Sequence, residues 1–335
     1  MSVRDSAGSG EDRLIADYFR PLADRPEALA LDDDAAFFAP PAGCDLVVTT
    51  DAIVAGVHFF ADDPADAIAR KALRVNLSDL AAKGADPAGF LLAIALPAGT
   101  SDEWLGAFSQ GLAADAKHYR CPLFGGDTVR SPGPLMISIT AFGTLPSGAM
   151  VHRAGAGAGD RVLVSGTIGD AALGLKLRRD AGLAQTWRLA SEPAKHLVGR
   201  YRLPQPRNAL AAAVRMHASA AMDVSDGLVG DLGKLCRASG VSGEIDLSQV
   251  PLSPNVRALI AVEPDLIETL LTGGDDYEIL CTVPESKVAS FAAAASAAGI
   301  AVTDIGRVLA GSGAPRFIGP AGKPMEFSQG AFSHF

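Results

Sequence analysis

Four short segments rich in aspartate are the strongest chemical signal in this chain of 335 residues. They combine acids with threonine, serine or glycine, and each stands where we expect a strand or a helix to end. Carboxylate and hydroxyl oxygens are the ligands that hard cations such as Mg²⁺ prefer. The segments are Asp32-Asp33-Asp34, Thr49-Thr50-Asp51, Gly125-Gly126-Asp127-Thr128 and Asp223-Val224-Ser225-Asp226-Gly227. Any one of them also fits a solvated turn or a helix cap, but together they indicate acids gathered around cations.

A fifth acid interrupts an apolar stretch. Asp79 lies in the segment Asn76-Leu77-Ser78-Asp79-Leu80, inside a predicted helix. A carboxylate buried among leucine and alanine must find a partner or a cation, because the loss of its hydration is unfavourable. We therefore add Asp79 to the candidate cation ligands. His58 fits either a ligand or an ordinary histidine of the core or the surface.

An acidic pocket repels polyphosphates unless cations intervene. ATP and a phosphorylated acceptor bring roughly six negative charges, and two like charges about 4 Å apart cost about 4 kcal/mol at an effective dielectric constant of about 20. Mg²⁺ reverses the sign, because it bridges carboxylates to phosphate oxygens and neutralises charge that develops during transfer. A cluster of acids therefore fits phosphoryl transfer from ATP to a small phosphorylated acceptor only if the site holds several metal ions.

Three glycine-rich segments resemble phosphate loops, but none has the complete pattern. Gly155-Ala156-Gly157-Ala158-Gly159 precedes its predicted strand, whereas a dinucleotide-binding turn follows one. Gly169-Asp170-Ala171-Ala172-Leu173-Gly174 has P-loop spacing, yet Leu175 replaces the required lysine. This segment predicts a helix start whose N–H groups face an anion. Gly273-Gly274-Asp275-Asp276-Tyr277-Glu278 predicts a tight acidic turn that enters a strand, either as a hairpin or as a loop facing the substrate.

Composition argues against several classes of protein. The net charge is −9 and no cluster of Lys and Arg compensates it, which argues against a nucleic-acid-binding surface. The longest apolar runs, such as residues 90–96, fall short of the about 20 residues that span a membrane, and the N-terminus lacks the apolar core of a signal peptide. The 4 cysteines lie far apart, as is typical of reduced thiols. We therefore expect a cytoplasmic protein with no membrane or nucleic-acid partner.

The elements that must position these residues alternate between strands and helices, which predicts an α/β or α+β protein of two domains. We expect strands at 45–51, 90–96, 135–144 and 161–165, helices at 11–19, 65–83, 102–119 and 169–178, and a continuing mixture at 228–236, 278–283 and 287–298. Gly84 is expected to end the second helix. The composition shifts to Pro, Ser, Ala and Gly over residues 146–159, which indicates a boundary. The predicted organisation is a mobile tail (1–11), an N-terminal domain (12–148) and a C-terminal domain (149–335).

Six motifs in a fixed order make this chain resemble a known family, the thiamine-monophosphate kinases of the aminoimidazole ribonucleotide synthetase-like (PurM-like) superfamily. The motifs are Asp33-Asp34-Ala35, residues 49–59 (TTDAIVAGVHF), residues 71–87 (KALRVNLSDLAAKGADP), residues 125–128 (GGDT), residues 221–228 (AMDVSDGL) and residues 273–278 (GGDDYE). The resemblance runs from about residue 11 to the C-terminal His334-Phe335, and the ordered set is far more specific than any single motif.

The resemblance implies a homodimer of two-domain subunits. The N-terminal domains would bind ATP and metal and pair into a shared β-barrel, and the C-terminal α/β domain would complete the active site near that interface. The implied reaction is ATP + thiamine monophosphate → ADP + thiamine diphosphate, by direct in-line transfer with several Mg²⁺ ions. This reaction is the final step of thiamine diphosphate biosynthesis.

The resemblance also implies roles for individual residues by motif position. The implied metal ligands are Asp34, Thr49, Thr50, Asp51, Asp79, Asp127, Asp223 and Asp226, of which Asp51, Asp79 and Asp127 are also implied to be catalytic. The implied ATP contacts are Gly126, Asp127, Arg153 and Ser225. The implied contacts to thiamine monophosphate are His58, Asp275 and an aromatic ring at Phe332.

The chain departs from the family pattern at three positions. Asp32 stands where the family usually has Gly before its Asp pair, which adds charge and restricts the backbone. Asp275 replaces the usual Glu and is shorter by about one methylene group. Phe332 replaces Tyr or Trp, so the stacking face is kept and the polar group is lost. These departures concern the substrate contacts more than the class of reaction.

Rival functions within the superfamily lack their own markers here. Selenophosphate synthetase needs a reactive Cys or selenocysteine with a Lys near the N-terminus, and Cys44 lies in no such motif. The hydrogenase-maturation relative ends in a reactive Cys, whereas this chain ends in His334-Phe335. An amidine-forming ligase shares the ATP site but lacks the Thr-Thr-Asp and Gly-Gly-Asp-Asp-Tyr-Glu motifs. A non-catalytic nucleotide- or metal-binding module is the alternative from another class, and turnover would distinguish it.

Overall fold

The computed structural model describes residues 10–328 and 330, and the contacts of the chain divide it into two compact units. The first unit extends to Asn76 and continues over Pro87–Thr144, while the second comprises Leu77–Asp86 and the chain from Leu145. Helix α2 (Ala65–Ala82) runs through the division without a break. The first described element is helix α1 (Gly10–Leu14), and residues 1–9 lie outside the described part.

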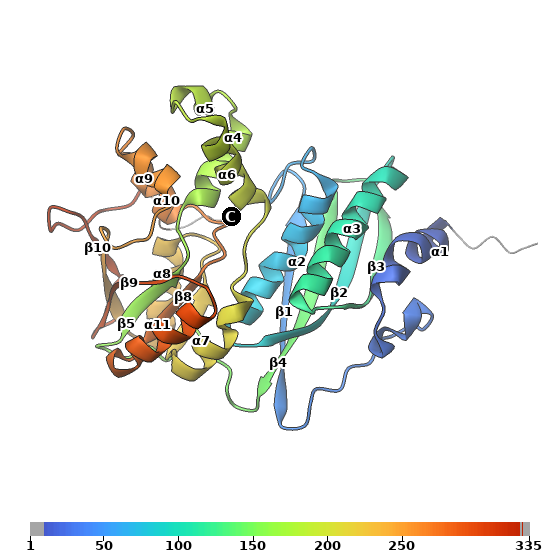
Figure 1. Cartoon of the computed structure of the whole chain (residues 1–335), viewed down its shortest axis with the longest axis horizontal. Coiled ribbons are helices and arrows are strands. Elements are labelled where there is room, and N and C mark those ends of the chain that lie inside the picture. Colours follow the sequence, from blue (N-terminus) through green and yellow to red (C-terminus); the bar gives the residue numbers. More distant parts are fainter. Residues whose placement is uncertain (1–9, 329, 331–335) are drawn as a thin grey trace, which may run out of the picture. The chain divides into compact units, whose positions relative to one another are not determined.

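The first unit is built on an open sheet of four strands in the order β1-β4-β2-β3. The strands are β1 (Cys44–Val54), β2 (Asp86–Pro97), β3 (Leu123–Ser131) and β4 (Met136–Pro146). Helices α2 and α3 (Asp102–Tyr119) lie side by side on one face of this sheet (Figure 1). Because β1 and β3 remain edge strands, the described residues of one chain form no closed barrel.

Local sequence explains why the helices of the first unit begin and end where they do. Ser101 caps α3 by accepting a hydrogen bond from the Trp104 amide at 3.2 Å, and Arg120 ends the helix in the left-handed conformation. Gly84 follows α2 with φ +75°, as expected of a glycine that ends a helix. At Gly111 a Cβ atom would lie 2.5 Å from the Asp66 carbonyl oxygen, so glycine allows α3 to approach α2 closely.

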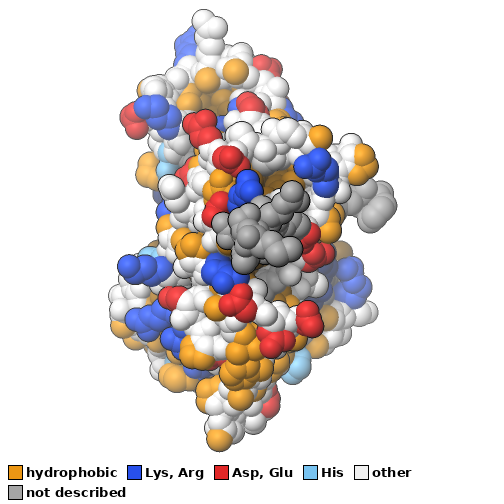
Figure 2. Space-filling model, turned by 90° about the vertical axis from the view of Figure 1, so that its right-hand side faces the viewer, with side chains coloured by type: hydrophobic (Ala, Val, Ile, Leu, Met, Phe, Trp, Pro, Cys, Tyr) orange, Lys and Arg blue, Asp and Glu red, His pale blue; other side chains and the backbone are white. Residues whose placement is uncertain are grey.

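The face of the first unit that carries its N-terminal helical segments is mixed in character (Figure 2). These segments are α1, a π-helical turn (Ile15–Phe19) and two 3₁₀ turns (Arg20–Leu22 and Pro26–Leu31). Acidic and basic side chains are interspersed there, and hydrophobic side chains gather in the lower part of the view. No described helix combines the length and the apolar composition that crossing a bilayer requires.

The second unit has a six-stranded mixed sheet in the order β10-β7-β9-β5-β8-β6. Its strands are β5 (Arg161–Ser165), β6 (Ala220–Asp223), β7 (Ser242–Asp246), β8 (Ile279–Val283), β9 (Val302–Leu309) and β10 (Arg316–Ile318). Its longer helices are α4 (Asp170–Arg179), α6 (Ser191–Arg202), α7 (Ala211–His217), α8 (Leu228–Ser239), α9 (Pro254–Ile260), α10 (Leu266–Thr272) and α11 (Val288–Ala297), with a short α5 (Leu183–Thr186).

Both faces of this six-stranded sheet are buried. Val162 and Val164 belong to one hydrophobic core, together with residues of α4, α8, α9 and α10, whereas Leu163 belongs to a second core with residues of α7 and α11. This division follows from the alternation of side chains along a strand. Two helical layers therefore cover the sheet, and the α/β character expected from the sequence is confirmed.

Two of the aspartate segments do not stand at strand ends, contrary to the sequence-based expectation. Thr49-Thr50-Asp51 lies within β1, and Gly125-Gly126-Asp127-Thr128 lies within β3. The glycine pair suggests a turn, but in β3 it allows a close approach to β2, because a Cβ atom on Gly126 would lie 1.9 Å from the Leu92 carbonyl oxygen. The register between β2 and β3 also shifts at Phe90/Leu91.

Candidate functional site

A cavity of about 740 Å³ opens on the face of the first sheet opposite its helices. Two of the aspartate segments meet there, since Asp33 and Asp34 line it together with Gly126 and Asp127 of β3. Thr140 of β4 also lines the cavity, and its hydroxyl donates a 3.1 Å hydrogen bond to the hydroxyl of Thr50 on β1. The cavity therefore combines acids, hydroxyls and a glycine backbone on one sheet face.

An aromatic wall forms the rest of this cavity. Phe124 stacks on Phe38 with a centroid distance of 5.6 Å and on Phe142 with a centroid distance of 6.3 Å. Phe19 and Phe37 also line the cavity. An apolar aromatic wall that meets a few polar groups is typical of a pocket for a ligand with a planar ring and a charged end.

Strand alternation separates the remaining acid of β1 from this face. Thr50 shares the cavity face through its bond with Thr140, and successive side chains of a strand point to opposite faces. Thr49 and Asp51 therefore point to the other face of β1, with the buried Val47 and Ile53. Within the first unit, the cavity contains Asp34, Gly126 and Asp127 but not Asp51.

The turn after β1 holds His58 in a defined orientation. The Val54 amide donates to His58 Nδ1 at 3.0 Å, and the ammonium of buried Lys71 donates to the His58 carbonyl at 2.9 Å. Because Nδ1 is an acceptor, the neutral imidazole carries its proton on Nε2. Such a ring can donate a hydrogen bond from Nε2.

Three sequence-predicted site segments of the second unit meet around strand β6. Asp223, buried at the end of β6, accepts a hydrogen bond from the Ser78 hydroxyl at 2.7 Å, one residue before Asp79. The Ala221 amide donates to the His152 carbonyl at 3.0 Å, which brings Arg153 to the same strand. The structure thus collects Asp79, Arg153 and Asp223 from three distant parts of the chain.

Lys83 is a basic residue at this place that sequence reasoning did not single out as a site residue. Its ammonium donates to the Ala221 carbonyl at 2.6 Å. Burial and the nearby Arg153 lower the pKa of Lys83, while Asp223 and Asp79 act in the opposite direction. A cation thus lies between the candidate carboxylates in this unit. Lys83 follows Asp79 by four residues, one helical turn, and this spacing was the sequence signal that could have identified it as a neighbour of Asp79.

The Gly273–Glu278 segment packs against the Asp223–Gly227 loop. The Asp275 amide donates to the Ser225 carbonyl at 2.9 Å, and the Tyr277 amide donates to the Val224 carbonyl at 2.8 Å. A Cβ atom on Gly274 would lie 2.2 Å from the Ser225 carbonyl oxygen, so only glycine permits this approach. Asp275 itself has φ +70°, a left-handed conformation that is uncommon outside glycine and Asn. The predicted substrate contact is thus fixed beside Ser225.

Helix α8 stabilises the Asp223–Gly227 loop through Asp231 and Lys234. Asp231 is fully buried and accepts hydrogen bonds from the amides of Ser225 and Asp226. Burial raises the pKa of Asp231, although Lys234 opposes this shift. Burial alone would lower the pKa of Lys234, but its hydrogen bonds to Asp226 and Asp231 raise it overall. Neither residue was expected from the sequence.

The N-terminus of helix α4 faces a carboxylate that belongs to the protein itself. Both carboxylate oxygens of buried Asp276 accept from the Gly169 amide, at 2.9 and 3.0 Å. Burial raises the pKa of Asp276 well above its ordinary value. The protein therefore supplies its own carboxylate at this helix end.

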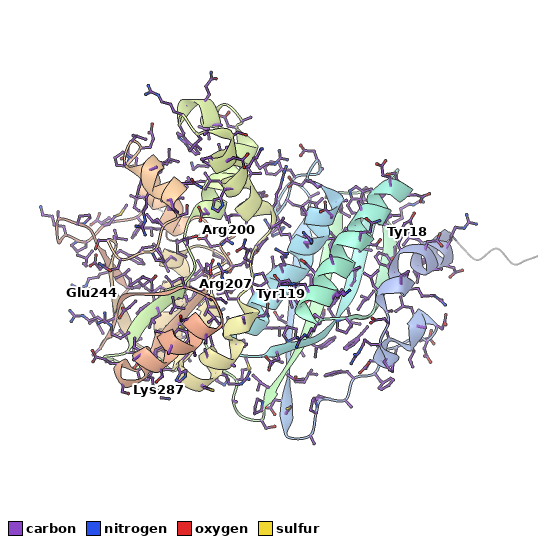
Figure 3. The ribbon with its side chains drawn as sticks, viewed as in Figure 1. Tyr18, Tyr119, Arg200, Arg207, Glu244 and Lys287 are labelled. Atoms are coloured by element: carbon purple, nitrogen blue, oxygen red, sulfur yellow. The ribbon has the colours of Figure 1, made fainter. Side chains whose placement is uncertain are left out.

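A buried ion cluster lies directly behind the same segment. Glu278 has no exposed surface and accepts from Arg200 at 3.0 Å, from Arg207 Nε at 2.6 Å and from the Ser165 hydroxyl at 2.6 Å. Arg200 comes from α6 and Arg207 from the loop that follows it (Figure 3). The cluster ties the motif that contains Asp275 to β5 and to α6. In the sequence, only the final Glu of that motif indicated this ion cluster.

The Arg153 loop has its own support. The hydroxyl of Ser239, the last residue of α8, accepts from the amides of Gly155 at 3.1 Å and Ala156 at 3.2 Å. It also donates to the Arg153 carbonyl at 3.4 Å. The glycine-rich segment is therefore a loop that enters β5, in agreement with the rejection of a dinucleotide-binding turn.

The predicted site residues thus fall into two groups. The first unit carries Asp34, Thr49, Thr50, Asp51, His58, Gly126 and Asp127, and the second carries Asp79, Arg153, Asp223, Ser225, Asp226 and Asp275. Phe332 lies outside the described residues. Over residues 10–328 and 330, no three Asp, Glu, His or Cys side chains are grouped so that they could hold a metal ion.

Comparison with protein families assigns both halves of the chain. Residues 32–145 match the AIR synthase related protein, N-terminal domain, and residues 157–317 match the AIR synthase related protein, C-terminal domain. A thiamine-monophosphate kinase of Caulobacter vibrioides is 46% identical over 303 residues, covering 89% of this chain and 84% of the relative. The thiamine-monophosphate kinase of Escherichia coli K12 is 40% identical over 331 residues, covering 97% and 98%.

Solved structures agree with these relatives. The thiamine-monophosphate kinase from Stenotrophomonas maltophilia K279a has a TM-score of 0.81 and 38% identity, covering 94% of this chain and 96% of its own. AaThiL complexed with AMPPCP and TMP has a TM-score of 0.76 and 31% identity, covering 89% of each chain. The hydrogenase maturation protein HypE in complex with ATP has a TM-score of 0.78 over 97% of this chain, and its 19% identity indicates a shared fold alone.

Proposed function

Because this chain belongs to the thiamine-monophosphate kinase family, we propose that it transfers the γ-phosphoryl group of ATP to thiamine monophosphate. The products are ADP and thiamine diphosphate, and the reaction completes the biosynthesis of thiamine diphosphate. The observation that carries this proposal is identity of 40% over nearly the whole length with a relative of that name. A 31% identical relative bound to AMPPCP, an analogue of ATP, and to TMP supports the same pair of ligands.

The proposed ATP contacts are Gly126, Asp127, Arg153 and Ser225. Gly126 and Asp127 are both exposed and line the cavity of the first sheet. Arg153 supplies a positive charge to phosphates, and Ser239 keeps its loop in place. Ser225 supplies a hydroxyl beside the carboxylate of Asp226. The aromatic wall of the cavity suits a planar ring.

Mg²⁺ fits the proposed ligand residues by its chemistry. The donors are carboxylate and hydroxyl oxygens, the type that this ion prefers. In the second unit, Asp226 already accepts a hydrogen bond from the ammonium of Lys234, which is consistent with a carboxylate that requires a positive partner. The proposed ligands are Asp34, Thr49, Thr50, Asp51, Asp79, Asp127, Asp223 and Asp226, with Asp51, Asp79 and Asp127 closest to the chemistry. When bound, the ions neutralise phosphate charge during in-line transfer.

The acceptor contacts are proposed to be His58, Asp275 and Phe332. The Nε2 proton of His58 suits a phosphate oxygen, because Nδ1 already accepts from the chain. The Asp275 amide donates a hydrogen bond to the Ser225 carbonyl, which fixes the backbone of Asp275 beside the Asp223–Gly227 loop. Phe332 would stack on a ring of the acceptor.

An assay of ADP release with different acceptors tests the proposed reaction. With ATP and Mg²⁺ present, we expect release of ADP with thiamine monophosphate and little release with thiamine, with other small phosphates or without acceptor. The control is the appearance of thiamine diphosphate, measured by chromatography, in equal amounts to ADP. Nucleotide binding without turnover for any acceptor would instead support a non-catalytic module and contradict the proposal.

The proposed enzyme is a homodimer whose first units pair through their open sheet faces into a shared β-barrel. Exposed apolar side chains support this arrangement, because Leu46 and Val48 of β1, Val129 of β3 and Met136 of β4 are from 39% to 54% exposed. Each is separated by an even number of residues from a residue on the cavity face of its own strand: Leu46 and Val48 from Thr50, Val129 from Asp127, and Met136 from Ser138. Strand alternation therefore places all four on the cavity face. Covering such a face with a second copy removes apolar surface from water, at about 25 cal/mol per Å².

The substitution Val48→Asp is expected to convert the dimer into a monomer. A carboxylate in an apolar contact loses hydration without gaining a partner, and the twofold symmetry introduces it twice. Light scattering coupled to size-exclusion chromatography measures the mass. Val262→Asp is the matched control, since Val262 is 69% exposed and lies in the second unit, and it should leave the mass unchanged. A dimeric Val48→Asp protein would count against the proposed interface.

A further inference from the structure

The backbone that carries Asp226 is held by one fully buried carboxylate. Oδ2 of Asp231, in the first turn of α8, accepts hydrogen bonds from the amide of Ser225 at 3.1 Å and from the amide of Asp226 at 2.9 Å. Its other oxygen accepts from the ammonium of Lys234 at 2.8 Å. Because two consecutive amides converge on a single oxygen, the position of Asp231 determines where this part of the loop lies.

The same ammonium also binds Asp226 itself. Lys234 donates a hydrogen bond to Asp226 Oδ2, so one cation is shared by two carboxylates. The side chain of Asp231 has 0% exposure, whereas that of Asp226 has 36%. Water cannot take the place of Lys234 beside Asp231, because the Asp231 side chain is fully buried. The partly exposed Asp226 can exchange this partner for another cation.

We propose that Lys234 is a positioning residue that serves as the built-in counter-cation of Asp226 and thereby weakens the binding of a divalent cation there. This inference rests on the proposed metal role of Asp226. A dication that binds Asp226 must displace the ammonium, since the two positive charges repel. Lys234 then keeps its bond to Asp231, which stays buried. The Asp223–Gly227 loop is therefore oriented, and the negative charge of Asp226 is compensated, before a metal binds. The metal binds less tightly because it must compete with Lys234.

The test removes the competing charge while it keeps the loop in place. Lys234→Met alone would leave Asp231 as an unpaired buried charge, so the main variant is D231N/K234M, in which the side-chain carbonyl of the introduced asparagine accepts from the two backbone amides. Electron paramagnetic resonance measures the binding of Mn²⁺ to the full chain without nucleotide or acceptor. D231N is the reference, because it lacks the same carboxylate and differs from the double variant only in the ammonium. Relative to D231N we expect about tenfold tighter binding, which is the repulsion between a dication and an ammonium about 6 Å apart at the dielectric constant of water.

Two controls separate charge from general effects of substitution. Lys234→Arg keeps the positive charge and is expected to bind Mn²⁺ with the affinity of the unmodified protein. Lys195→Met removes a lysine that also pairs with an acid three residues earlier, Glu192 at 2.8 Å, but in a largely solvated setting. It is expected to change nothing. If D231N/K234M does not fold, Lys234→Gln removes the positive charge but keeps a hydrogen-bond donor for Asp231, and tighter Mn²⁺ binding than in Lys234→Arg is expected.

The outcomes distinguish this inference from the proposed function. Unchanged or weaker Mn²⁺ binding by a folded D231N/K234M protein overturns the role of Lys234. If Asp226→Asn does not weaken Mn²⁺ binding, the metal role of Asp226 is wrong, and the inference falls with it. If Asp226→Asn weakens binding and also abolishes the effect of D231N/K234M, the competition is confirmed. Because no turnover is measured, absence of kinase activity would leave this result intact.

Discussion

An Asp127→Asn enzyme is expected to convert thiamine monophosphate about 10²- to 10³-fold more slowly than the unmodified protein, the usual effect of losing one group that stabilises charge in the transition state. Asp127 lines the cavity of the first unit and is exposed, so the neutral side chain fits the same space. The substitution removes one proposed anionic ligand of the Mg²⁺ ion that would bridge the protein and the phosphates. The coupled ADP assay at saturating ATP measures the effect, and circular dichroism should show an unchanged fold.

Asp33→Asn is the matched control for this prediction. Asp33 lines the same cavity and carries the same charge, but it has no proposed metal role, and its Oδ1 accepts from the Asp34 amide, which an Asn side chain can also do. We expect activity within about threefold of the unmodified protein, as is common for exposed positions with no direct role. Asp79→Asn, from the second unit, should match Asp127→Asn. Full activity in the Asp127→Asn or Asp79→Asn enzyme would contradict the metal role of that residue.

Glu278→Gln should lower the free energy of unfolding of the second unit by about 3–5 kcal/mol, the typical effect of breaking a buried ion pair. The side chain keeps its shape but loses the charge that balances Arg200 and Arg207, which are largely buried. Both guanidinium groups then lose the negative charge of Glu278, which water cannot replace at a buried position. Such a loss corresponds to a decrease of about 10 °C in the midpoint of thermal unfolding.

Glu244→Gln is a matched control on the same sheet. Glu244, labelled in Figure 3, also accepts from two arginines, Arg307 at 2.9 Å and Arg316 at 2.8 Å. The side chains of these two arginines are more than half exposed. Surface pairs of this kind contribute about 0–1 kcal/mol each, so little change is expected. Trp187 is buried in the second unit, and the other tryptophan, Trp104, can be replaced by Phe so that fluorescence reports this unit. Equal losses for both glutamates would contradict the prediction.

Elements with strong local signals could be predicted closely from the sequence. Helix α3 begins and ends at the expected residues because Ser101 supplies a cap and Arg120 ends the helix with its left-handed backbone. Short strands such as β6, β7 and β10 were not predicted. Their three to five residues are held by neighbours far away in the chain, so their local sequences carry little periodicity.

The candidate site shows the same division. The acids of the metal motifs and the Gly273–Glu278 turn could be recognised from residue types, since both depend on short stretches of sequence. The supporting residues could not be recognised in this way. Asp231 and Lys234 resemble an ordinary exposed helix turn, and Arg200 and Arg207 resemble surface charges, until packing places them beside Asp226 and Glu278.

For this protein, residue types and order alone determined the family, the class of reaction and the acids that are candidates for it, because those properties depend on short motifs. Tertiary structure alone decided that Gly126-Asp127 lies inside a strand at an aromatic cavity, that Asp276 occupies the N-terminus of α4 and that one lysine serves two carboxylates. The physical reason is burial. Whether a charge is solvated, paired or available to a ligand depends on neighbours that the chain brings together only when it folds.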